Sequence, residues 1–93
     1  MQSKLAIPTI HLNGTSKAAL IEQLCEASNK LKAGLQALSD AAPNGRDYYV
    51  QPAGSFELAR AQAQIRYSMV LEVIRQIEAI TLAVDEQETT IRG

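Results

Sequence analysis

The feature that most constrains the fold is a long C-terminal stretch, from Ser55 to Arg92, that contains neither proline nor glycine. These two residues most often interrupt a helix, so their absence favours one long helix. Apolar residues recur in this stretch at alternating intervals of four and three, at Ala63, Tyr67, Val70, Ile74, Ile77, Thr81 and Val84. That period places them on one helical face. The sequence therefore predicts a helix over 55–88, with Ser55 as its N-cap.

A second helix is predicted over 15–39. Its apolar stripe has the same spacing and comprises Leu20, Leu24, Ala27, Leu31, Gly34 and Leu38, with Ile21 and Leu35 beside it. Gly34 lowers helix propensity by about 1 kcal/mol relative to alanine. It is either simply tolerated or marks the close approach of another helix. Prolines and glycines end both helices within a loop over 40–54. The fold class is therefore all-α, a long antiparallel helical hairpin.

The N-terminal residues 1–14 have a different pattern. Pro8 disfavours a helical conformation for the residue before it. Ile7, Thr9 and His11 alternate with their neighbours at a period of two, which is typical of a strand or an extended arm. We expect an extended arm over 1–14 that precedes the hairpin. With 93 residues, the chain forms a single domain.

The C-terminal helix also carries a second apolar strip, formed by Met69, Val73 and Ile80. A hairpin buries one face of each helix, so this strip would stay in water in a monomer. A chain of this size also has little core of its own. We therefore expect a homo-oligomer, of which a dimeric four-helix bundle is the simplest form. The alternative is a monomer in which the arm covers the second strip.

Composition excludes several classes of function. The formal net charge is −1, from nine basic and ten acidic residues, so no basic face is expected to bind duplex nucleic acid. One cysteine, Cys25, and one histidine, His11, make neither a disulfide nor a zinc site. We expect Cys25 to be a buried small hydrophobe. With no bilayer-spanning run, signal peptide or catalytic motif, we expect a cytoplasmic protein that is not an enzyme and needs no metal or cofactor.

The loop and the following helix carry the residues best suited to a ligand, which are Arg46, Tyr48, Tyr49, Arg66 and Tyr67. Arginine offers a planar fork of donors to phosphate or carboxylate. Tyrosine offers a ring face for stacking and a hydroxyl for hydrogen bonds. Together they are typical of a site for an anionic, ring-containing ligand such as a nucleotide. The alternative is packing, with Arg46 paired to Asp47 and the tyrosines closing the end of the bundle.

The start of the first helix offers a second set of candidate ligand-binding residues, Asn13 and Thr15. Free backbone N–H groups at a helix start bind anions, and the nearby hydroxyls and Lys17 would assist. An ordinary helix cap uses the same residues. In an oligomer, this helix start could face the loop or the second helix of another copy and form a composite pocket.

Two strings, IPTIHLNGTSKAALIEQL and PNGRDYY, resemble those of small, mostly helical proteins encoded by tailed phages and prophages. The resemblance covers roughly residues 7–49 and implies a phage-encoded protein that acts in the host cytoplasm. Small helical phage proteins of this build include anti-defence sponges, which are oligomers that bind cyclic nucleotides or related immune signals between subunits. No sponge motif matches residue by residue, so this link is an analogy.

The sequence thus favours a non-enzymatic sponge that sequesters a nucleotide-derived immune signal. The alternative is a protein-interaction or morphogenesis accessory that acts through the apolar face of the helix over 55–88. An enzyme that cleaves the signal is disfavoured, because no constellation of metal ligands or nucleophile is present.

Overall fold

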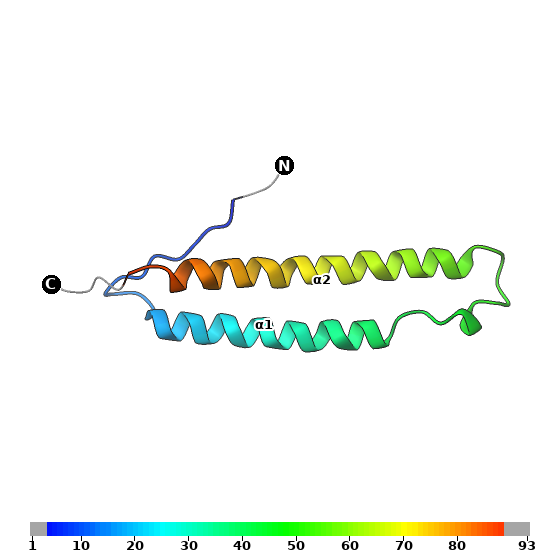
Figure 1. Cartoon of the computed structure of the whole chain (residues 1–93), viewed down its shortest axis with the longest axis horizontal. Coiled ribbons are helices and arrows are strands. Elements are labelled where there is room, and N and C mark those ends of the chain that lie inside the picture. The colour runs from blue at the N-terminus through cyan, green and yellow to red at the C-terminus, as the bar shows by residue number, and fades with distance from the viewer. Residues whose placement is uncertain (1–3, 89–93) are drawn as a thin grey trace.

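A computed structural model describes residues 4–88 as an antiparallel pair of helices (Figure 1). Helix α1 spans Lys17–Asp40 and helix α2 spans Ser55–Asp85, with a short 3₁₀ turn, η1, at Gly45–Asp47 between them. Of residues 4–88, 68% are helical, and the predicted all-helical hairpin is confirmed. The arm is irregular rather than a strand over its described residues, and it lies beside the C-terminal end of α2.

Helix α1 begins two residues later than the predicted range, because Ser16 is its N-cap. Ser16 has an extended backbone, and its hydroxyl accepts a hydrogen bond from the Ala19 N–H at 3.1 Å. This bond satisfies one of the N–H groups that a helix start leaves without a partner. The helix ends at Asp40, and Pro43 follows shortly after.

Helix α2 begins as predicted at Ser55, but Ser55 is not the N-cap. Gly54 occupies that position with φ of 92°, in the left-handed region that glycine adopts without a steric penalty. The Ser55 hydroxyl instead donates to the Pro52 carbonyl at 2.7 Å and closes the preceding turn. The prediction of a serine cap was wrong because the glycine turn already sets the entry of the chain. Helix α2 ends at Asp85, three residues earlier than expected.

The core is a single seam between the two helices. Ile74 and Val84 of α2 are 2% and 0% exposed, and Leu35 is the buried apolar residue of α1. On α1, Ser28 and Leu35 face α2, whereas the predicted stripe members Ala27 and Gly34 are exposed. The leucines of the stripe fit either register, and the register that the chain adopts buries the larger Leu35.

The hairpin is elongated and has a large surface for its length. The extents are 70 × 28 × 17 Å and the radius of gyration is 19.5 Å, compared with about 12 Å for a compact chain of this length. The accessible surface is 7104 Å², against about 5,300 Å² expected for a monomer of 10.1 kDa. The isolated hairpin therefore leaves an unusually large share of its surface in water.

Much of that surface is an apolar stripe on the outer side of α2, which we call the α2 stripe: Leu58, Ile65, Met69 and Val73. These four side chains are between 45% and 59% exposed. Met69 and Val73 belong to the predicted second strip, whereas its third member, Ile80, is half-buried. The described part of the arm lies beside the C-terminal end of α2 and leaves the α2 stripe exposed. None of the helices described between residues 4 and 88 is long and apolar enough to cross a bilayer.

Gly34 provides a test of the seam. A Cβ added at Gly34 would meet no atom within 4 Å, so close helix approach within the chain is excluded. We expect Gly34→Ala to raise the free energy of unfolding by about 1 kcal/mol, because alanine is the better helix former. Urea unfolding at one fixed protein concentration measures the change, and Ala33→Gly on the same exposed side serves as the reverse control. A loss of stability in Gly34→Ala would instead indicate that a second copy packs against this position.

Candidate functional site

The predicted site residues lie in two groups at opposite ends of the hairpin. Asn13 and Thr15 are at the arm end, and Arg46, Tyr48, Tyr49, Arg66 and Tyr67 lie in and next to the loop. Helix α1 has 24 residues and separates the two groups by about 36 Å at 1.5 Å per residue. A single chain therefore does not bring the two groups together.

The arm end is organised by the side chain of Gln87. Its Oε1 accepts from the Ile10 N–H at 2.9 Å, and its Nε2 donates to the Pro8 carbonyl at 2.6 Å. The Gln87 carbonyl in turn accepts from Lys17 Nζ at 2.7 Å. We call these three hydrogen bonds the Gln87 clasp. The clasp joins the arm, the start of α1 and the residues that follow α2, which are far apart in the sequence.

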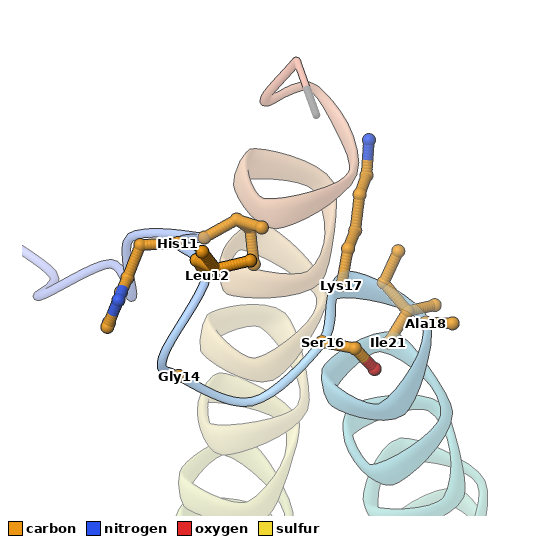
Figure 2. A pocket seen from close by; sticks show the side chains of 8 residues that line it. His11, Leu12, Gly14, Ser16, Lys17, Ala18 and Ile21 are labelled. Carbon is orange, nitrogen blue, oxygen red and sulfur yellow. The ribbon is translucent and has the colours of Figure 1, made fainter. Parts of the chain in front are cut away.

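A pocket of about 560 Å³ opens beside this clasp (Figure 2), and residues of the arm and of the first turns of α1 line it: Ile10, His11, Leu12, Ser16, Lys17 and Ile21. The His11 ring lies close to Gly14, where an added Cβ would be 2.6 Å from His11 Nε2. Figure 2 shows the side chains of His11 and Lys17 projecting away from each other. The pocket is mainly apolar with a few polar groups, the usual character of a small-ligand site.

The two predicted residues at this end are exposed and lie outside the lining of the pocket. Asn13 is part of the turn closed by the Gly14 N–H and the His11 carbonyl at 3.1 Å. Thr15 precedes the cap residue Ser16. Both side chains face solvent and are available to a ligand or a partner.

The loop end is closed by aromatic packing around Phe56. The rings of Tyr48 and Phe56 have centroids 6.0 Å apart, and the Arg60 guanidinium lies 5.7 Å from the Phe56 centroid. Such tilted aromatic pairs and cation–π contacts each contribute about 1 kcal/mol. Tyr48 is half-buried and packs against Phe56. Its neighbour Tyr49 is 80% exposed.

Two hollows adjoin this aromatic cluster, and each is lined by one of the two predicted α2 residues. Arg66 lines a hollow of about 260 Å³ with Asn44, Asp47 and Tyr48. Tyr67 lines the other, of about 300 Å³, with Arg60. A guanidinium and a tyrosine ring thus stand together in each hollow.

Arg46 is exposed and held by the loop backbone, since its N–H donates to Asn44 Oδ1 at 2.9 Å. The ion pairs within the described range 4–88 are Glu26–Lys30 and Lys32–Glu78. The alternative pairing of Arg46 with Asp47 is therefore absent from that range, and the Arg46 guanidinium stays available to an anion.

Across residues 4–88, no three His, Cys, Asp or Glu side chains are grouped so that they could hold a metal ion. Cys25 is exposed on α1, so the expectation of a buried cysteine was wrong. It lies one position away from the buried seam. What the two ends offer is guanidinium groups, aromatic rings and amides, the groups that bind an anion with rings.

Sequence reasoning missed Gln87, Phe56 and Arg60 as organising residues. The i, i+4 spacing of Phe56 and Arg60 was a usable signal, because such pairs are neighbours on a helix. Gln87 gave no local signal, since its partner Pro8 lies 79 residues away. No protein-family model, curated protein or solved structure matches this chain.

The Gln87 clasp yields a prediction about the arm. We expect Gln87→Ala to lower the free energy of unfolding by about 1–2 kcal/mol, because two hydrogen bonds are lost. We also expect faster hydrogen exchange at the Ile10 amide, which donates to Gln87. Exchange followed by mass spectrometry measures the effect, with Glu88→Ala as the control. Gln87→Glu keeps the acceptor for Ile10 and should have a smaller effect on that amide. Equal exchange in the alanine and control variants would contradict the clasp.

Proposed function

We propose that this chain is a non-enzymatic, homo-oligomeric protein that sequesters a nucleotide-derived signal at sites shared between subunits. The observation that carries the proposal is the placement of candidate binding groups at both ends of a hairpin whose intervening helix exposes an apolar stripe. Each end alone has part of a site. Association through the α2 stripe completes it.

The first step of the argument is the apolar area of the α2 stripe. Leu58, Ile65, Met69 and Val73 are spaced at intervals of seven, four and four, so they lie along one line of the helix. Burial of apolar surface stabilises association by about 25 cal/mol per Å². A two-fold axis across the stripe makes the contact self-complementary, which closed dimers require.

The second step is orientation. When two long hairpins pack antiparallel, the arm end of one copy lies next to the loop end of its partner. Asn13 and Thr15 of one copy would then lie toward the loop end of the other, on the side of Arg46 and Tyr49. Arg66 and Tyr67 would lie next to the two-fold axis near residue 65, where the same residues of the partner approach them.

The third step assigns roles in that shared site. Arg66 and the exposed Arg46 would bind phosphates, for which the guanidinium fork is suited. The exposed Tyr49 and the partly exposed Tyr67 would stack on bases, while Tyr48 stays packed on Phe56. Asn13 and Thr15 would donate hydrogen bonds. Binding without turnover lowers the free concentration of the signal, which is how a sponge would protect a phage in the host cytoplasm.

The same stripe supports a second candidate function, that of an interaction or morphogenesis accessory. An exposed apolar line on a helix also accepts a helix of another protein. This candidate predicts that the chain captures a specific protein and ignores nucleotides.

Association through the α2 stripe predicts a change of mass in solution. We expect Ile65→Lys to shift the molar mass toward the 10.1 kDa monomer, because it would bury an unpaired charge in the interface. Light scattering after size exclusion measures the mass. Ala33→Lys on the exposed face of α1 is the matched control and should keep the wild-type mass. A wild-type protein that is monomeric throughout would overturn the shared-site proposal.

Ligand binding is tested with a panel of cyclic di- and trinucleotides and ADP-ribose derivatives. We expect one class to raise the melting temperature of the wild type, because ligand binding stabilises the native state. In calorimetry, Arg66→Ala should weaken that ligand by about 10- to 100-fold, the loss of one charged hydrogen-bonding group. Arg75→Ala, elsewhere on α2, should bind like the wild type. A flat screen with an intact oligomer would favour the accessory function.

A further inference from the structure

The arm exposes one edge of its backbone in a defined conformation. The Gln87 carboxamide bonds the carbonyl of Pro8 and the N–H of Ile10, the two residues on either side of Thr9. In a parallel pair of strands, one residue bonds the carbonyl before and the N–H after a given residue of the neighbouring strand. The Gln87 carboxamide bonds the groups on either side of Thr9 in the same way. In extended backbone, successive residues point their polar groups to opposite edges. The N–H and carbonyl of Thr9 therefore point away from Gln87.

This second edge, which we call the free edge, consists of the backbone of Ile7, Thr9 and His11. All three residues are exposed. Within residues 4–88, the backbone groups of Ile7 and Thr9 form no hydrogen bond, and the His11 carbonyl bonds only the Gly14 N–H. The free edge thus presents unpaired donors and acceptors at Ile7 and Thr9 and the N–H of His11, which together are a template for another strand.

The composition of the arm leaves the free edge unprotected. Proteins usually protect such edges with charged residues or proline. No Asp, Glu, Lys or Arg occurs from Leu5 to Ser16. Pro8 is the one proline of the arm, and its backbone faces the edge that Gln87 occupies. Its missing N–H therefore removes no donor from the free edge. The β-branched residues Ile7, Thr9 and Ile10 favour strand pairing.

We propose that the free edge pairs with the free edge of a second copy, as an antiparallel two-stranded contact centred on Thr9. An antiparallel pair is symmetric about its central residue, so the Thr9 N–H of each copy donates to the Thr9 carbonyl of the other. Ile7 of one copy then lies opposite His11 of its partner. The occupant is the same segment of the same chain, and the contact has two-fold symmetry.

This inference rests on the homo-oligomer of the proposed function and extends it. In an antiparallel pair held by the α2 stripe, the two-fold axis passes near residue 65, midway between Leu58 and Val73, and the end of α2 at Asp85 lies about 30 Å from that axis. The two arms therefore lie at opposite ends, about 60 Å apart. Those two arms cannot reach each other. Each arm therefore pairs with an arm of another dimer, and the α2 stripe and the free edge form two separate interfaces. Two such two-fold contacts build assemblies with more than two copies.

The first test is disulfide trapping in a Cys25→Ser background. A hydrogen-bonded antiparallel pair holds opposite Cα atoms about 5.5 Å apart, within the range that a disulfide spans. We expect Thr9→Cys to form a covalent dimer on mild oxidation at least about tenfold faster than Thr15→Cys, because a docked pair has a high effective concentration. Thr15 is also exposed but lies outside the paired segment. Equal rates in the two variants would overturn the proposal.

The second test separates the two interfaces by mass. Thr9→Pro removes the N–H of the free edge and keeps an extended backbone. We expect its mass to fall to about twice 10.1 kDa, while Thr9→Val keeps the wild-type mass. Ile65→Lys should break the α2 interface but leave arm pairing intact, so Thr9→Cys should still form a covalent dimer when the two substitutions are combined. The two interfaces can therefore fail separately. A Thr9→Pro protein with the wild-type mass would refute arm pairing.

Discussion

The structure depends on one constraint, which is that two helices have only one seam between them. Ile74, Val84 and Leu35 fill this seam and are buried. Neighbouring apolar side chains such as Leu24 and Ile77 are half-buried, and those on other faces of the helices remain in water. The exposed line from Leu58 to Val73 follows directly from that limit. Lengthening the hairpin does not relieve this limit, because each added helical turn exposes more surface than it buries between the two helices.

The two ends of the hairpin solve the same problem in different ways. At the loop end, Tyr48 and Arg60 pack against the ring of Phe56. These contacts involve only the loop and the start of α2. At the arm end no aromatic residue is available, and the closure is made by backbone hydrogen bonds to Gln87. The first closure is local in sequence and apolar, whereas the second is long-range and polar. The arm end therefore depends more on the intact chain than the loop end does.

The sequence was sufficient to predict the helices and the seam of α2, since those follow from periodicity and from the placement of proline and glycine. It was not sufficient for the face of α1, because Ala27 and Ser28, or Gly34 and Leu35, fit the same leucine spacing. The candidate site was predicted as residue types, and the structure divides them between two ends. The packing of Tyr48 and the exposure of Tyr49 were not predictable, because adjacent loop residues have no period that distinguishes inside from outside. The role of Gln87 arises from a contact between residues distant in sequence, for which local patterns carry no information.

That distance also determines the order in which the molecule assembles during folding. The Gln87 side chain bonds the Pro8 carbonyl across 79 positions of a 93-residue chain, so in an unfolded chain this contact closes nearly the largest possible loop. The entropic cost of closing such a loop makes this contact slow to form until the two helices have packed together and brought Pro8 close to Gln87. The arm is then the last unit to dock and the first to open, a small cooperative unit with its own low opening free energy. Transient release of the arm would break the bonds to Gln87 and leave the helical seam intact, so partial unfolding of this protein begins at the end where the arm meets the residues after α2.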